Sequence, residues 1–164
     1  MAKKEILLGT WNDEPLRWVV LKEDDFGMLV ISKESIGKRQ FNGDNSTNTW
    51  SDSDLRKFLN GEFFETAFLK EDKKKIVNSY LEYPEGTKDN IFILSQEEMK
   101  QLLLKDDSDK YEDNYYKYIE FIFYCWTRTP SGYNNVFIID EFFEWFAINI
   151  QNSYDVCPAM YIKK

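Results

Sequence analysis

The chain has 164 residues, of which 43% are hydrophobic and 30% charged, and this length and composition are typical of one globular domain spanning residues 1–164. The formal net charge of −8 at pH 7 disfavours nucleic acid and anionic lipid as partners, because their phosphate groups carry the same sign. The chain contains no histidine, which excludes Ser-His-Asp catalysis, Cys-His catalysis and zinc sites that use imidazole.

The N-terminus lacks the features of a targeting segment. No apolar run approaches the roughly 20 residues of a membrane span, and near the N-terminus only Ile6–Leu8 is apolar, where a signal peptide needs about 7 to 15 such residues. We therefore expect a cytoplasmic protein with no membrane partner. Two cysteines, Cys125 and Cys157, are too few for a disulfide framework and are predicted to be reduced and buried. No glycine-rich phosphate loop occurs, and we expect no cofactor and no metal.

The N-terminal part is predicted to form a hairpin or a three-stranded meander. Residues 5–11, 16–22 and 28–32 are rich in strand-forming side chains, and residues 24–27 (DDFG) form a turn between the last two strands. Polar residues and turn formers dominate 37–49, which predicts a long surface loop.

Short helices are predicted in the middle of the chain. Ser51 and Asp54 resemble a capping box, and the apolar residues 55, 58 and 59 share one helical face until Asn60-Gly61 interrupts it. A second short helix is predicted over 63–68. Ser95 and Glu98 form a further capping box, which opens a helix with Met99, Leu102 and Leu103 on one face.

Strands are predicted on either side of these helices. Residues 76–83 and 90–94 are expected to be strands, and the acidic stretch 105–114 an exposed loop. From residue 115 onwards, three or four strands are joined by turns at 130–135 and 151–155. The fold class is therefore α+β, with a mixed or antiparallel sheet, two to four short helices and a single compact domain.

Two groups of carboxylates suggest chemistry only weakly. Asp107, Asp109 and Asp113 do not match a calcium-binding loop, so a solvated loop is the better interpretation. The carboxylates at 140, 141 and 144 leave open a site of the glycosidase type, but sequence alone does not show their spatial separation.

The aromatic residues near the C-terminus suggest a binding surface. Tyr133, Trp145 and Tyr154 are predicted to lie on loops, where Tyr and Trp give a large contact area at low entropic cost. The neighbouring phenylalanines are predicted to belong to the core: Phe137, Phe142, Phe143 and Phe146.

Four segments in this order resemble a family of bacterial and phage domains without an established activity. The segments are LRWVVLKEDDFGMLVISK (16–33), NTWSDSDLRKFLNGEFFETAF (48–68), DNIFILSQEEMKQLL (89–103), and the pair CWTRTPSG (125–132) and VCPAMYIK (156–163). That family is similar to a divergent C-type-lectin-like fold related to the formylglycine-generating sulfatase-modifying domain.

The resemblance implies a fold and a region for ligands. C-type-lectin-like domains generally present ligands near their C-terminal strands, which corresponds to residues 128–155 and adds Arg128 to the candidate ligand-binding residues. Cys157 stands where the family pattern has arginine, and the cysteines of this chain are 32 positions apart (157 minus 125). The copper chemistry of the related enzymes is therefore not transferred to this chain.

Three functions remain open from the sequence. The first is a non-catalytic binding module for an unidentified protein or small ligand, which the resemblance associates with phage or mobile elements. The second is an acidic inhibitor or immunity-type protein that occupies a basic site on a partner and uses residues 106–113. The third is an enzyme with a carboxylate-based site.

Overall fold

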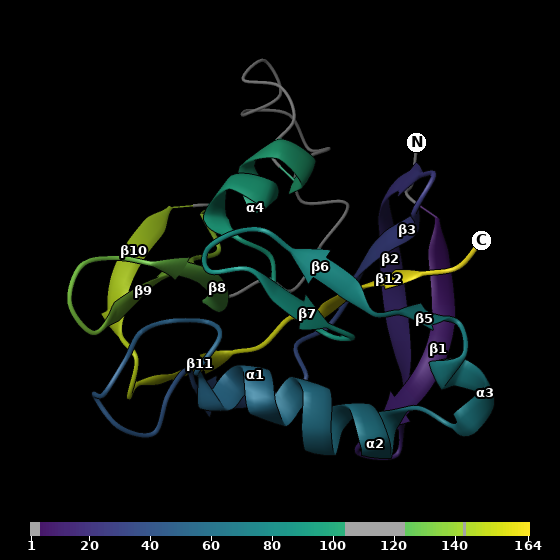
Figure 1. The fold of residues 1–164 in the computed structure, drawn as a ribbon, viewed down its shortest axis with the longest axis horizontal. Coiled ribbons are helices and arrows are strands. Elements are labelled where there is room, and N and C mark those ends of the chain that lie inside the picture. The colour runs from purple at the N-terminus through teal and green to yellow at the C-terminus, as the bar shows by residue number, and fades with distance from the viewer. Residues whose placement is uncertain (1–3, 104–123, 143) are drawn as a thin grey trace.

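The computed structural model describes residues 4–103, 124–142 and 144–164, and in this part of the chain most strands belong to two sheets (Figure 1). The first sheet is antiparallel. Its strands, in spatial order, are β1 (Glu5–Trp11), β2 (Glu14–Asp24), β3 (Gly27–Ser32), β12 (Ala159–Ile162) and β5 (Ile76–Val77).

The second sheet is mixed, because β11 runs parallel to β8 while all other neighbouring strands of this sheet are antiparallel. Its order is β10 (Trp145–Asn149), β9 (Asn135–Ile139), β8 (Cys125–Pro130), β11 (Ser153–Asp155) and β4 (Lys38–Gln40). A small hairpin of β6 (Ser79–Leu81) and β7 (Thr87–Asp89) lies across the junction of the two sheets (Figure 1).

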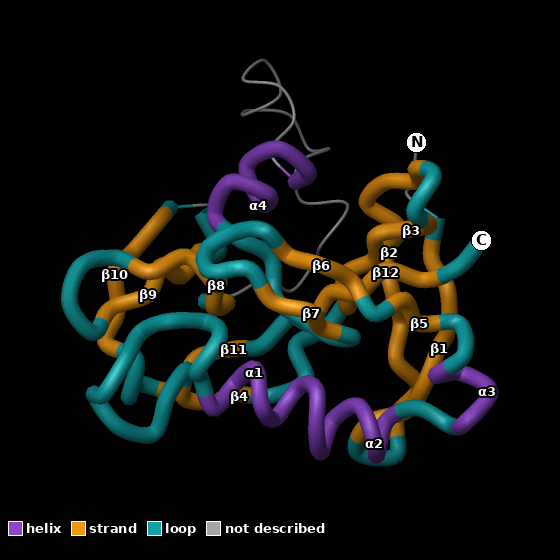
Figure 2. The backbone as a smooth tube through the Cα atoms, in the orientation of Figure 1, coloured by secondary structure: helices purple, strands orange, loops and turns teal. Residues whose placement is uncertain are grey.

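Helices lie at opposite edges of the strands, as Figure 2 shows. Along one edge, α1 (Asp54–Phe58), the π-helical turn η1 (Leu59–Phe63) and α2 (Phe64–Ala67) follow one another without a break, and α3 (Lys70–Lys73) comes next. At the other edge lies α4 (Gln96–Leu103). Together these elements form one compact α+β domain composed mostly of sheet. The α+β class agrees with the prediction from the sequence.

The predicted N-terminal meander is confirmed. Asn12 and Asp13 have φ values of 51° and 64°, which suit the two-residue turn between β1 and β2. The turn between β2 and β3 needs Gly27, whose φ is 138°. A Cβ at this position would lie 2.3 Å from the carbonyl oxygen of Ile162. Glycine therefore lets the C-terminal strand approach the hairpin.

The prediction that 37–49 is entirely a surface loop is wrong. β4 pairs with β11, and Phe41 and Asn42 are buried directly after it. The Phe41 ring packs against Trp50 and Trp126, with ring centroids 6.3 and 5.7 Å apart. A single aromatic residue among polar ones therefore anchors this segment in the core.

The predicted helix break at Asn60-Gly61 is also wrong. Ser53, not Ser51, is the N-cap, and its side chain accepts from the backbone N–H of Arg56 (3.0 Å). At Leu59 the helix widens into η1 and continues through Asn60 and Gly61. The Asn60 side chain donates to the carbonyl oxygen of Ile91 (2.8 Å) and accepts from the N–H of Asn90 (2.8 Å), and these tertiary bonds compensate for its low helix propensity.

The strand predicted over 76–83 is divided between two sheets as β5 and β6. Residues 91–94 are buried as expected, but within 90–94 only Phe92 pairs as a strand does, through a bridge to Ala159. The capping box at α4 is confirmed: Ser95 Oγ accepts from the N–H of Glu98 (3.1 Å), and Glu98 Oε2 accepts from the N–H of Ser95 (2.9 Å).

The C-terminal strands are present, and the predicted turn at 151–155 also contains β11. The assignment of the phenylalanines to the core is partly wrong. Phe142 and Phe146 are 67% and 42% exposed. Phe137 is half-buried, and it points to the face of β9 opposite to the buried Val136 and Ile138. Phe143 lies outside the described residues. No helix in the described part of the chain has both the length and the apolar character of a membrane span.

Candidate functional site

The structure does not bring Tyr133, Trp145 and Tyr154 together. Tyr133 is 88% exposed in the turn between β8 and β9. Trp145 pairs with Ile139 at the other end of the β9–β10 ladder, with Lys100 Nζ 5.7 Å from its ring centroid. These two residues therefore lie on opposite ends of the sheet.

Tyr154 lies on β11, two strands away from β9. Its ring packs edge-on against Trp126, with centroids 5.4 Å apart, and it also contacts Tyr124. Tyr154 is thus half-buried in an aromatic cluster, and the three residues do not form one recognition patch.

Arg128 has a structural position on β8, where it is 1% exposed. Its Nη1 and Nη2 donate to the two carboxylate oxygens of Glu98 (2.6 and 2.7 Å). A second N–H of Nη1 donates to the carbonyl oxygen of Ile93 (2.7 Å), and Nε donates to that of Tyr83 (2.9 Å). The guanidinium joins β8 to α4, and almost none of its surface is accessible to a ligand.

The ion pair between Glu98 and Arg128 makes stability depend on pH. Burial alone would raise the pKa of Glu98. The hydrogen bonds and positive charge of Arg128 and the hydrogen bond from the N–H of Ser95 outweigh burial, and they lower the pKa below its ordinary value of 4.5. A carboxylate whose pKa falls on folding stabilises the protein above pH 4.5. This contribution is lost as pH decreases from 4.5 through the lower folded value.

We therefore expect Glu98→Gln to lower the free energy of unfolding at neutral pH, and the difference from the native protein to narrow below about pH 4.5. Glutamine can retain the capping interaction, so the variant removes the charge selectively. Urea unfolding at several pH values checks this. Glu97→Gln, at an exposed neighbouring position, is the control. A difference that stays constant from neutral pH to about pH 3 would contradict the assignment.

Cys125 and Cys157 are close in space, with sulfur atoms 2.6 Å apart, and both are buried. Desolvation raises the pKa of the Cys125 thiol well above its ordinary value, with further contributions from Cys157 and Asp155. Both cysteines are free thiols. Their burial confirms the prediction that both lie in the core.

Of the carboxylates at 140, 141 and 144, Asp140 has a structural position. Asp140 is buried, and its Oδ1 accepts from the N–H groups of Phe142 (2.9 Å) and Glu144 (2.8 Å), which shapes the turn after β9. The residues described here contain no group of three or more acidic or cysteine side chains that could hold a metal ion. The loop 105–114, which includes the proposed inhibitor contact at 106–113, lies outside the described residues.

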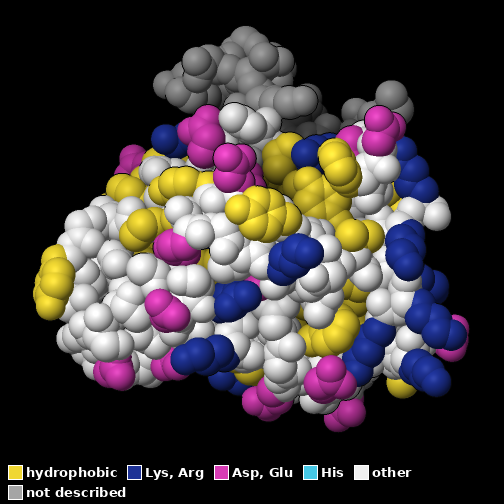
Figure 3. All heavy atoms as spheres, viewed as in Figure 1, with side chains coloured by type: hydrophobic (Ala, Val, Ile, Leu, Met, Phe, Trp, Pro, Cys, Tyr) yellow, Lys and Arg dark blue, Asp and Glu magenta, His cyan; other side chains and the backbone are white. Residues whose placement is uncertain are grey.

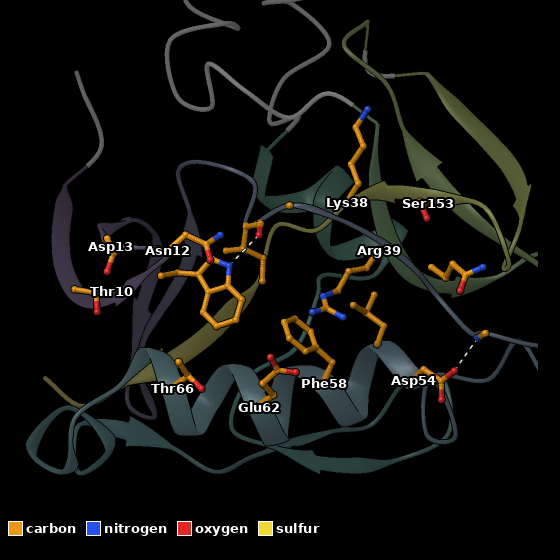
Figure 4. Close-up of a pocket in the computed structure, with 16 residues that line it drawn as sticks. Thr10, Asn12, Asp13, Lys38, Arg39, Asp54, Phe58, Glu62, Thr66 and Ser153 are labelled. Carbon is orange, nitrogen blue, oxygen red and sulfur yellow. Dashed lines mark hydrogen bonds between the residues drawn. The ribbon is translucent and has the colours of Figure 1, made fainter.

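A hollow of about 980 Å³ lies between the β1–β2 turn, β4 and the helix α1–η1–α2 (Figure 4). We call it the β4–helix groove. A second hollow of about 710 Å³ adjoins it and shares residues with it, among them Trp11. The Trp11 Nε1 donates to the carbonyl oxygen of Ile36 (3.1 Å), which fixes the indole between the two hollows.

Arg39, on β4, is the central cation of the β4–helix groove. Its guanidinium carbon lies 3.3 Å from the centroid of the Phe58 ring, and Phe58 itself is only 9% exposed. Within the described residues, the Arg39 side chain forms no ion pair or hydrogen bond. Its stacking on a fixed ring orients the guanidinium plane and leaves its N–H donors available.

One stripe of the helix forms the floor of the groove. Its residues are spaced by four: Asp54, Phe58, Glu62 and Thr66. In an α-helix with 3.6 residues per turn this spacing drifts around the axis, and the wider π-helical turn η1 between Phe58 and Phe64 reduces the drift. The π-helical turn therefore helps to align these side chains along the groove (Figure 4).

The sequence interpretation missed this groove. The signals available were the four-residue spacing from Asp54 to Thr66 and the basic pair Lys38-Arg39 inside a polar segment. Of the predicted ligand region 128–155, Ser153 lines the groove. The groove is otherwise formed by the N-terminal half of the chain.

The fold and the groove define a small α+β domain with a polar ligand-sized hollow beside its helix. Residues 26–164 match a family described as "Domain of unknown function (DUF6273)", and the chain belongs to this family. Comparisons with curated proteins and with solved structures gave no significant match. Trp11, at the end of β1, and the turn that follows it precede the matched residues.

Proposed function

We propose that this protein is a non-catalytic binding module whose small ligand occupies the β4–helix groove. The observation that carries the proposal is Arg39, which is stacked on Phe58 and has no acidic partner in the described residues. An oriented guanidinium that faces a hollow of about 980 Å³ is a typical anchor for a small polar ligand.

The absence of histidine from the whole sequence favours binding over catalysis, because it removes the side chain best suited to proton transfer at neutral pH. We further propose that the fold is C-type-lectin-like. The order of the four sequence segments supports this relationship, as does a domain composed mostly of sheet with few short helices. An experimental structure superimposed on that fold class tests the relationship.

A screen of small polar molecules by ligand-observed NMR tests the binding function. We expect hits that bind the native protein and bind Arg39→Met at least tenfold more weakly, because methionine removes the charged donors but keeps an apolar contact with Phe58. Lys88→Met, which removes an exposed cation outside the groove, is the matched control. Hits that bind both variants as tightly as the native protein would contradict the assigned site.

A further inference from the structure

We infer that the ligand of the β4–helix groove is a small zwitterion, whose carboxylate is bound by Arg39 and whose ammonium group is bound by Glu62. This inference rests on the proposed binding function. It assigns a chemical class to the ligand from the arrangement of charges and apolar surface in the groove.

The carboxylate end follows from the geometry of Arg39. A guanidinium presents pairs of parallel N–H donors in a plane, and a carboxylate accepts two of them at once. The Phe58 ring, 3.3 Å from the guanidinium carbon, covers one face of this plane and directs binding to its edge. The neighbouring Lys38 extends away from Arg39 in Figure 4. Arg39 is therefore the residue that receives the anionic end of the ligand.

The ammonium end follows from Glu62. Glu62 is exposed, lies four residues after Phe58 on the same stripe, and points towards the same space as Arg39 in Figure 4. Four residues of helix rise about 6 Å along the axis, so Glu62 is placed about one turn beyond the ring on which Arg39 stacks. Among the described residues, Glu62 and Arg39 form no ion pair with each other. A zwitterion can complete both interactions simultaneously.

The balance of charge favours a carboxylate over a phosphate. The side chains of the groove include three carboxylates (Asp13, Asp54 and Glu62) and two cations (Lys38 and Arg39). A doubly charged phosphate would meet net repulsion there, whereas a molecule with one negative and one positive group would not. Asp54 is already engaged, because its Oδ2 accepts from the N–H of Gly43 (2.7 Å), so Glu62 is better placed to bind an ammonium group.

Apolar surface is available for the connecting carbon chain. Trp11, which is half-buried, lines the groove and contacts the buried Phe58 edge to face, with ring centroids 5.8 Å apart, so the indole supplies this surface. A methylene chain lying on aromatic rings loses contact with water, which favours a ligand with a short aliphatic stem over a fully polar one.

Isothermal titration with 4-aminobutyrate and 6-aminohexanoate tests the inference. Hexanoate and hexylamine, which each carry one of the two charges, serve as matched probes. We expect one or both zwitterions to bind at least tenfold more tightly than either single-charge probe. Arg39→Met and Glu62→Gln should each reduce that affinity at least tenfold, whereas Lys88→Met and Glu82→Gln, at exposed positions outside the groove, should leave it unchanged.

The possible outcomes separate the inference from the function on which it rests. Hexanoate binding as tightly as 6-aminohexanoate would overturn the role of Glu62 and leave an anion site at Arg39. If neither zwitterion binds while another molecule from the NMR screen depends on Arg39, the ligand class is wrong and the binding function stands. If no molecule in that screen depends on Arg39, both proposals fail.

Discussion

Replacing Arg128 with methionine is expected to lower the free energy of unfolding by about 3–5 kcal/mol, because the substitution removes one partner of a buried ion pair. Arg128 is 1% exposed and binds both carboxylate oxygens of Glu98. Its loss leaves that carboxylate without its cation and the carbonyl oxygen of Ile93 without this donor. Chemical denaturation followed by intrinsic fluorescence measures the change.

Arg17→Met is the matched control for this experiment. Arg17 pairs with Glu34 at the surface, where both side chains are more than a third exposed, and such pairs contribute about 0–1 kcal/mol. The double variant Arg128→Met, Glu98→Gln should recover part of the loss, because it removes the uncompensated charge. A loss of less than 1 kcal/mol in Arg128→Met would show that Arg128 does not stabilise the fold as described.

Replacing Asp89 with alanine is expected to cost a similar amount, about 3–5 kcal/mol. The Asp89 side chain is fully buried and accepts three hydrogen bonds. The donors are Trp50 Nε1 (2.9 Å), Thr87 Oγ1 (2.7 Å) and Arg56 Nε (2.7 Å). Alanine leaves the buried indole and hydroxyl without an acceptor, which adds to the loss of the ion pair.

Thermal and urea unfolding of Asp89→Ala measure this loss, with Asp25→Ala as the control at an exposed turn position. A surface substitution of this kind is expected to change stability by less than about 0.5 kcal/mol. Equal stability of the two variants would contradict the structural role of Asp89.

These two buried networks connect the sequence segments that carry the family resemblance. Trp50 and Arg56, in segment 48–68, bind Asp89 at the start of segment 89–103. Arg128, in segment 125–132, binds Glu98 in segment 89–103. The most recognisable residues of the chain therefore hold its framework together. Arg39 lies in none of these segments, so the resemblance contains no information about the central cation of the proposed site.

Much of the fold could be predicted from local patterns. The strands at 5–11 and 28–32 and the capping box at Ser95 and Glu98 depend on neighbouring residues, and the structure confirms them. The helix break at Asn60-Gly61 was predicted from intrinsic propensity, but tertiary hydrogen bonds from Asn60 overcame it. Whether β4 forms a strand depends on its pairing with the distant β11, and the local sequence carries little signal for such pairing.

The candidate site was predicted least well, for the same reason. Tyr133, Trp145 and Tyr154 are close in sequence, but the register of β9 with β10 places the first two at opposite ends of a ladder. The side chains of the β4–helix groove come instead from four separate parts of the chain: residues 10–13, 36–43 and 54–66, and Ser153. Sequence could indicate Arg39 and Glu62 as exposed charges, but only the fold brings them to one hollow.

The net charge of the whole chain does not describe each face of the molecule. The net charge of −8 suggested an acidic surface for a basic partner. On the face in Figure 3, however, acidic and basic side chains are both present, with Lys and Arg gathered along the right-hand edge, where Figure 1 places α3 and the C-terminus. That face is not uniformly acidic, so the overall charge does not define a binding surface there.

Mapping of amide chemical shifts by ¹H–¹⁵N NMR during titration with a screening hit tests the central claim most directly. We predict that the largest changes occur in the β4–helix groove, at Arg39, Phe58 and Glu62, and that they are lost in Arg39→Met. Changes concentrated around Tyr133 or Trp145, with the groove unaffected, would contradict the assignment of the groove as the ligand-binding site.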